Sequence, residues 1–182
     1  MENFGKTDSD NAPNNKIDLI FQDESLFRYN MTDIWNAITD VGKKPPVYRE
    51  SIATGVLKLT KKSIQIISEG DSHKGSIKEA STIAAIQGVK DTARTIPHCH
   101  PIPIEACSVK WNLEEIGLRC TVTVSAHWKT GVEMEALCGV NAGLLCAWDM
   151  LKSQEKNSEG QYPNSEIQQI RIVKKVKQEP HS

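Results

Sequence analysis

Lysine, histidine and carboxylate side chains gather in four short stretches of this sequence, and each stretch could bind an anion or transfer a proton. The first is Ser72-His73-Lys74-Gly75, at the expected start of a long helix that Ser72 could cap. The positive end of a helix dipole disfavours a lysine ammonium but attracts anions. Lys74 is therefore a candidate to meet an anionic ligand. The alternative is an ordinary solvated lysine in a first helical turn.

The second stretch, Ile96-Pro97-His98-Cys99-His100-Pro101, places two histidines between prolines. Alternate side chains of an extended segment share a face, so His98 and His100 could converge on a metal ion. A structural zinc site needs about four ligands, however, and no second His/Cys pair stands at ligand spacing. We favour a rigidly held histidine for ligand binding or proton transfer. A zinc-dependent hydrolase built on His98, Cys99 and His100 is the alternative.

The third stretch, Thr130-Gly131-Val132-Glu133-Met134-Glu135, opens a second long helical pattern. Thr130 followed by Glu133 matches a capping box, which is a purely structural explanation for Glu133. On a helix, Glu133 and Glu135 would lie about 200° apart. If both carboxylates serve one site, we expect the helix to begin between or after them.

The fourth stretch holds Asp149 and Lys152, three residues apart near the end of the same helix. An ordinary surface pair at this spacing is worth only a few tenths of a kcal/mol. Trp148 and Leu151 belong to the buried stripe, so we expect desolvation to perturb the titration of the pair and suit it to acid–base work.

The distance along this helix predicts a shared site. Glu133 and Asp149 are sixteen residues apart, which is about 24 Å of straight helix. A small ligand cannot easily touch both ends within one subunit. If both ends are functional, a second subunit should complete the site.

The elements that position these residues follow from changes in hydrophobic period. Alternation and mixed parity predict strands, the first covered on both faces, and spacings of three and four predict helices, with one helix of about five turns ending before Pro97. The expected order is strand 49–59, a short helix at best over 61–69, helix 75–95, hairpin 109–113 and 118–126, helix 132–151 and strand 170–177. This order predicts an α+β fold, a ferredoxin-like antiparallel sheet with two long helices on one face.

Composition sets the outer limits on function. The chain has 182 residues and a formal net charge of −1, which suits one domain with tails and argues against a dedicated nucleic-acid or anionic-membrane binder. It has no apolar run near the ~20 residues of a bilayer span and no leader-like start. Its five cysteines, nowhere spaced C-x-x-C, predict reduced thiols in a cytosolic protein. We expect an acidic, flexible extension over 1–30, a catalytic domain over 31–177, with a surface loop at 153–165, and a tail over 178–182.

In combination, these stretches resemble the MoaC family, the cyclic pyranopterin monophosphate synthases of molybdenum cofactor biosynthesis. The resemblance runs from about residue 31 to residue 177. Its motifs are MTDI followed by VGKKP (31–45), HKG (73–75), IPHCHP (96–101), KTGVEMEAL (129–137) and WDMLK (148–152). The combination of TGVEMEAL, a downstream D-M-x-K and an upstream C-H-P is highly specific.

The resemblance implies a cytoplasmic lyase that converts 3′,8-cyclo-7,8-dihydro-GTP, the product of a radical S-adenosylmethionine GTP 3′,8-cyclase, into cyclic pyranopterin monophosphate and pyrophosphate. It implies no cofactor, although Mg²⁺ could accompany the triphosphate. It implies a homo-oligomer, a hexamer assembled as a trimer of dimers with active sites at the dimer interface. It also implies catalytic roles for Lys74, Asp149 and Lys152, and substrate-binding roles for Arg49, Cys99, His100, Glu133, Met134, Glu135 and Lys175, with no metal ligand.

This sequence departs from the family pattern in three places. Val176-Lys177-Gln178-Glu179-Pro180 stands where the family commonly has a Gly-Gly-Lys-Ser tail, Trp148 replaces a frequent tyrosine, and the acidic extension is additional. The missing tail bears on how the phosphate end of the substrate is clamped. A non-catalytic nucleotide-binding oligomer on the same scaffold is the alternative function, and the lysine pair with Asp149 argues against it.

Overall fold

The computed structural model describes residues 37–70 and 72–178. The acidic extension predicted for 1–30, the MTDI motif and the last four residues of the tail lie outside the described residues. The domain boundary at residue 31 therefore stays a prediction.

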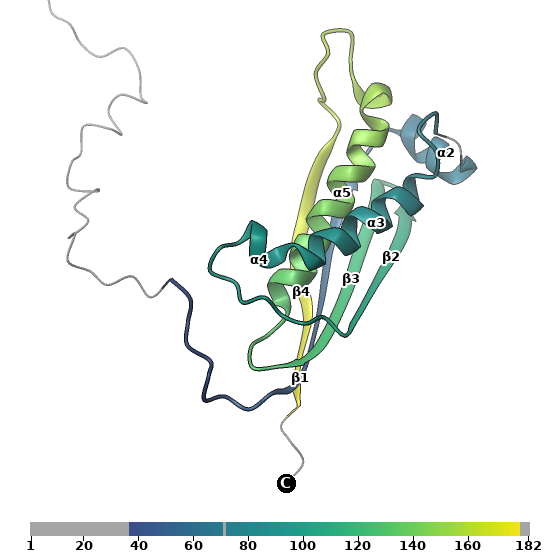
Figure 1. The fold of residues 1–182 in the computed structure, drawn as a ribbon. Helices are drawn as coiled ribbons and strands as arrows, with labels where there is room; N and C mark the ends of the chain where they lie inside the picture. The colour runs from purple at the N-terminus through teal and green to yellow at the C-terminus, as the bar shows by residue number, and fades with distance from the viewer. Residues whose placement is uncertain (1–36, 71, 179–182) are drawn as a thin grey trace, which may run out of the picture. The chain divides into compact units, whose positions relative to one another are not determined.

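Four antiparallel strands form one sheet, in the order β2-β3-β1-β4. The strands are β1 (Val47–Lys58), β2 (Ala106–Glu114), β3 (Gly117–Trp128) and β4 (Glu166–Gln178). Two long helices, α3 and α5, lie together on one face of this sheet (Figure 1). The predicted ferredoxin-like α+β architecture is confirmed.

The helices are α2 (Lys61–Glu69), α3 (Ile77–Lys90), α4 (Thr92–Thr95) and α5 (Glu133–Glu155). The single helix expected over 75–95 is wrong, because the chain leaves helical geometry at Asp91 and resumes in the short α4. The hydroxyl of buried Thr92 donates to the carbonyls of Gly88 and Val89. Ser76, rather than Ser72, caps α3 by accepting from the Glu79 N–H.

The core lies between the sheet and the two long helices. Ala53 and Leu57 of β1 belong to this core and are fully buried. Gly55 lets α5 approach the sheet, since a Cβ there would lie 2.9 Å from the Val140 side chain. Thr54 and Val56 project to the other face of the sheet, and they are buried as well, with 5% and 0% exposed. The predicted cover of β1 on both faces is therefore confirmed over residues 53–57.

Glu155 fixes the far end of α5. The residue is only 3% exposed. Its carboxylate accepts hydrogen bonds from the Thr60 hydroxyl at 2.8 Å, from the Thr60 N–H and from the Ser165 hydroxyl. Burial alone would raise the pKa of Glu155, but the hydrogen bonds from Ser165, Ser63 and Thr60 outweigh burial and lower the pKa. This carboxylate ties the starts of α2 and β4 to the end of α5.

The loop that follows α5 covers 156–165, close to the prediction. Its turn is built around Asn157, whose side chain accepts from the N–H groups of Glu159 and Gln161. No helix within residues 37–70 and 72–178 has the length and apolar character of a bilayer-spanning segment.

Replacing the Glu155 carboxylate should destabilise the fold. We expect Glu155→Ala to lower the free energy of unfolding at pH 7 by about 2–3 kcal/mol, because buried donors lose their acceptor. A lowered carboxyl pKa stabilises the folded state above the pKa of the unfolded chain, so the loss should shrink as the pH falls below about 4. Urea unfolding between pH 3 and pH 8 measures both effects. Glu159→Ala, an exposed neighbour in the loop, should change little, and an equal loss at every pH would contradict this account.

Candidate functional site

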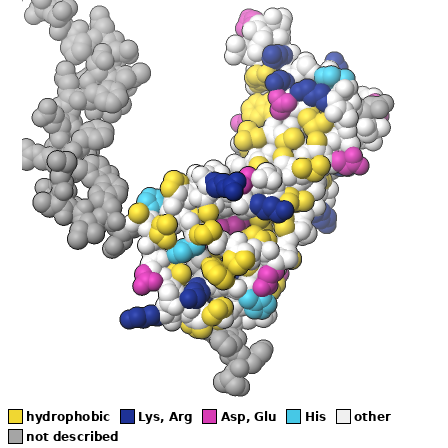
Figure 2. Space-filling model, in the orientation of Figure 1, with side chains coloured by type: hydrophobic (Ala, Val, Ile, Leu, Met, Phe, Trp, Pro, Cys, Tyr) yellow, Lys and Arg dark blue, Asp and Glu magenta, His cyan; other side chains and the backbone are white. Residues whose placement is uncertain are grey.

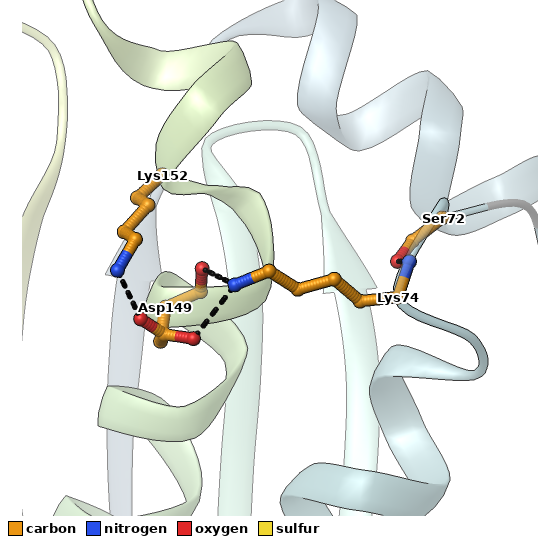
Figure 3. A network of polar contacts seen from close by, with 4 residues as sticks. All are labelled: Ser72, Lys74, Asp149 and Lys152. Carbon is orange, nitrogen blue, oxygen red and sulfur yellow. Dashed lines mark hydrogen bonds and ion pairs between the residues drawn. The ribbon is translucent and has the colours of Figure 1, made fainter.

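Asp149 stands between two lysines that come from different parts of the chain. Lys74 donates to Asp149 Oδ2 at 2.8 Å and to the Asp149 carbonyl at 3.0 Å, and Lys152 donates to Oδ1 at 2.6 Å (Figure 3). Lys152 lies one turn along α5, whereas Lys74 reaches across from the segment before α3. The structure thus brings together the three residues to which the family resemblance gives catalytic roles.

A short turn places Lys74 for this contact. The Lys74 N–H donates to the Ser72 hydroxyl at 3.1 Å, and the Gly75 N–H donates to the Ser72 carbonyl at 2.9 Å. Gly75 has φ of 93°, in the left-handed region that glycine adopts readily. Ser72 therefore shapes this turn, and the Lys74 ammonium extends to α5 instead of remaining a solvated first-turn lysine.

Ion pairing, and not desolvation, sets the titration of this cluster. The Asp149 and Lys152 side chains are 55% and 49% exposed, so the predicted desolvation is wrong. Hydrogen bonds from Lys152 and then Lys74 lower the pKa of Asp149 to about 2, and the hydrogen bond to Asp149 raises the pKa of Lys152. Lys152 is therefore protonated at neutral pH, and Asp149 is ionised.

A pocket of about 530 Å³ lies at the opposite end of α5. Its wall includes five residues to which the resemblance gives substrate-binding roles: Cys99, His100, Glu133, Met134 and Glu135. The other residues of the wall have no predicted substrate-binding role: Thr39, Val41, Lys44, His98, Ile102, Thr130, Gly131 and Ile172. Among these, His98 was a candidate metal ligand and Thr130 a candidate helix cap. Lys44 lies in the VGKKP motif, which could have identified it.

The two glutamates of this pocket differ in their surroundings. Helix α5 begins at Glu133 and has no side-chain cap, so the predicted capping box is wrong. Glu133 instead forms an ion pair with Lys175 of β4, and its carboxylate lies where a side chain on Gly131 would stand. Both glutamates line the pocket although the helix includes both, contrary to the expectation that it would begin between or after them.

Glu135 is a buried acid. The residue is only 4% exposed, and burial, followed by the charge of Glu133, raises its pKa. Burial and the Glu135 charge also raise the pKa of Cys99, so this cysteine is a thiol at neutral pH. A site with a protonatable buried acid and a neutral thiol suits polar recognition of an uncharged heterocycle better than nucleophilic attack by sulfur.

Basic residues of the sheet lie beside Glu133. Arg49 of β1 pairs with Lys177 of β4, and Ser51 pairs with Lys175. Paired residues project to the same face, so Arg49, Lys175 and Lys177 share the face on which α5 packs. Arg49 Nε is buried and has no hydrogen-bond partner among the described residues. Such an N–H group can donate a hydrogen bond to an anionic ligand without first losing a partner.

The two clusters remain apart within one protomer. Asp149 and Lys152 border a smaller hollow of about 230 Å³ together with Leu145, Trp148 and Tyr162. The residues that line this hollow and those that line the larger pocket do not overlap. The described part of the chain brings no three His, Cys, Asp or Glu side chains into a metal-binding group.

Comparison with known proteins identifies the family of this chain. Residues 38–178 match the sequence model of the MoaC family. The chain is 45% identical over 142 residues to a protein of Pyrococcus furiosus named "Probable cyclic pyranopterin monophosphate synthase", covering 78% of this chain and 91% of that one. A protein of Archaeoglobus fulgidus with the same name is 44% identical over 140 residues, 77% of this chain and 90% of its own.

The match spans every strand of the sheet, the pocket from Thr39 onward and the lysine–aspartate cluster, and it ends at the last described residue. On this evidence the chain belongs to the MoaC family.

Proposed function

We propose that this protein is a cyclic pyranopterin monophosphate synthase, a lyase of molybdenum cofactor biosynthesis. Its substrate is 3′,8-cyclo-7,8-dihydro-GTP, and its products are cyclic pyranopterin monophosphate and pyrophosphate. The observation that carries this proposal is the placement of Asp149 between Lys74 and Lys152 in a chain of this family. The cytoplasm, where a radical S-adenosylmethionine cyclase would supply the substrate, is the proposed location.

Proton transfer falls to the lysine–aspartate cluster. Opening a purine-derived ring, rebuilding it as a pterin and closing a cyclic phosphate all require protons to be moved at defined atoms. Lys152 begins as a donor, because Asp149 raises its pKa. Asp149 holds both ammonium groups in place, so it acts as the orienting group.

Substrate binding falls to the pocket and the basic face beside it. His100, Glu133 and Glu135 offer hydrogen-bonding groups to the base and sugar. Arg49 and Lys175 are placed to hold phosphate oxygens, which Arg binds in a planar, bidentate fashion. Lys175 leaves Glu133 when it does so. These strand residues would clamp the phosphates in the absence of the family's Gly-Gly-Lys-Ser tail.

A second copy of the chain would complete each site. One protomer carries the two clusters at opposite ends of α5, and a small substrate cannot span them. The helical face also exposes large apolar side chains: Ile83 of α3 is 70% exposed and Leu145 of α5 is 57% exposed. Figure 2 shows hydrophobic side chains spread over this face. A homo-oligomer, assembled as a hexamer of three dimers, fits both features.

The activity rests on Lys152. We expect Lys152→Ala to keep its fold and oligomeric state but to lower kcat by about 10²–10⁴-fold, because a positioned proton donor is lost. Mass spectrometry of the product and an assay of released pyrophosphate measure turnover. Lys156→Ala, one turn further on, is the matched control and should retain activity. Wild-type turnover by Lys152→Ala would remove this assignment, and binding without pyrophosphate release by the unmodified protein would favour the non-catalytic alternative.

The ionised Glu135 carboxylate should lower the thermal stability of the protein while it contributes to substrate binding. A raised carboxyl pKa means that the ionised form costs stability above the pKa of the folded state and costs none below the pKa of the unfolded chain. We therefore expect Glu135→Gln to raise the thermal midpoint at pH 8, with no gain at pH 3.5, while weakening substrate binding. Glu133→Gln, which loses an ion pair, should give no such gain. Scanning calorimetry checks the midpoints, and destabilisation of Glu135→Gln at pH 8 would refute the account.

Two inactive variants should restore each other if the site is shared. Mixing Lys152→Ala with Glu135→Ala after dissociation and reassembly gives hybrid dimers in which one of two sites has both halves intact. Random pairing predicts recovery of about a quarter of wild-type activity. Each variant reassembled alone is the control. If a verified hybrid shows no recovery, each active site takes both clusters from the same protomer, and the shared site is refuted.

A further inference from the structure

A segment without helix or strand forms part of the pocket wall. Residues 37–44, here termed the strap, precede β1 and contribute Thr39, Val41 and Lys44 to the pocket. The strap leads into β1 on the side of the molecule where α4 and the loop after it lie (Figure 1). Sheet pairing begins only at Val47, so the sheet ladder does not hold the strap in place.

Two side chains of the pocket wall, His98 and His100, and the nearby Lys129 bind the strap backbone. His98 Nδ1 contacts the carbonyl oxygen of Ala37, and His100 Nε2 contacts that of Thr39 at 2.8 Å. Lys129, just after β3, donates to the carbonyl of Gly42 at 2.8 Å. Two of these three anchors come from the Pro-flanked segment that carries His100. The segment that carries His100, a candidate ligand-binding residue, therefore also holds the strap against the pocket.

These contacts fix where each imidazole carries its proton. A carbonyl oxygen only accepts hydrogen bonds, so the nitrogen facing it must donate. A neutral His98 is therefore protonated at Nδ1 and a neutral His100 at Nε2. The lone pair of His100 is left on Nδ1, and only that atom can accept a proton or a hydrogen bond from a ligand.

We propose that His98 is a positioning residue: it docks the strap against the pocket and so fixes the wall, and the proton placement on His100, that the substrate meets. The effect on substrate rests on the proposed function, whereas the docking of the strap does not. His98 is exposed. Without it, the side-chain hydrogen bonds that join the strap to the rest of residues 37–70 and 72–178 would be those of His100 and Lys129. The protonation of His100 at Nε2 would then lose part of its support.

Hydrogen exchange of the ligand-free full chain tests the docking. We expect the amides of residues 37–44 to exchange about fivefold faster in His98→Ala, the factor that one lost hydrogen bond of ordinary strength provides. His98→Asn places an amide nitrogen near the position of Nδ1 and should restore slow exchange. His127→Ala, a histidine bound to Glu105 instead, should leave the strap unchanged. Protection of β3 amides reports that each variant is folded.

Two further measurements separate positioning from a purely structural role. Long-range ¹H–¹⁵N spectra should assign the proton of neutral His98 to Nδ1 and that of neutral His100 to Nε2 in the wild type. In turnover, His98→Ala should raise KM about fivefold with kcat within about twofold, and His98→Asn should restore KM.

Each outcome decides the proposal. Unchanged strap exchange in His98→Ala, or a His98 proton on Nε2, overturns it. Faster exchange with an unchanged KM overturns the role in substrate binding. If the wild type releases no pyrophosphate, the proposed function fails, but the exchange and tautomer results still decide whether His98 docks the strap.

Discussion

The length of one straight helix constrains everything else in this molecule. Helix α5 runs without interruption from Glu133 to Glu155, and its packing is tight along its length. A Cβ on Gly139 would lie 2.7 Å from the Val89 side chain, and one on Gly88 would lie 2.7 Å from Ala142. The first turn of α5 carries the buried Glu135, and the fifth turn carries Asp149. In the proposed shared site, this helix holds the two groups apart as half-sites that a second copy of the chain would complete.

Each end of α5 holds a carboxylate that is paired with a lysine from another element. Asp149 takes Lys74 from the segment before α3, and Glu133 takes Lys175 from β4. These pairs keep the lysines ordered where the chain has little net charge to attract an anion over a long distance. In the proposed function, the substrate phosphates would compete with Glu133 for the Lys175 ammonium. Phosphate binding at β4 would then be an exchange of one anionic partner for another.

Sequence patterns determined the fold well and the local geometry less well. Alternation in 118–126 and three–four spacing in 132–151 predicted β3 and α5, because a buried face imposes its period on the sequence. The capping box at Thr130 failed because Glu133 finds a stronger partner in Lys175, forty-two residues away. The single helix over 75–95 failed at Asp91, where no glycine or proline signals an interruption. Site residues were predicted through motif resemblance, whereas the contact between His98 and the strap joins residues sixty-one positions apart and has no local signature.

The lysine–aspartate cluster also shows how one carboxylate can set the charge of two neighbours. The hydrogen bond to Asp149 raises the pKa of Lys152, so the ammonium form is the resting form at neutral pH. Hydrogen bonds from both lysines lower the pKa of Asp149 to about 2, so the carboxylate is ionised there. Each partner thus stabilises the charged form of the other. In the proposed function, a lysine of this cluster can act as a base only after it has lost a proton, and the loss becomes easier when its contact with Asp149 is weakened.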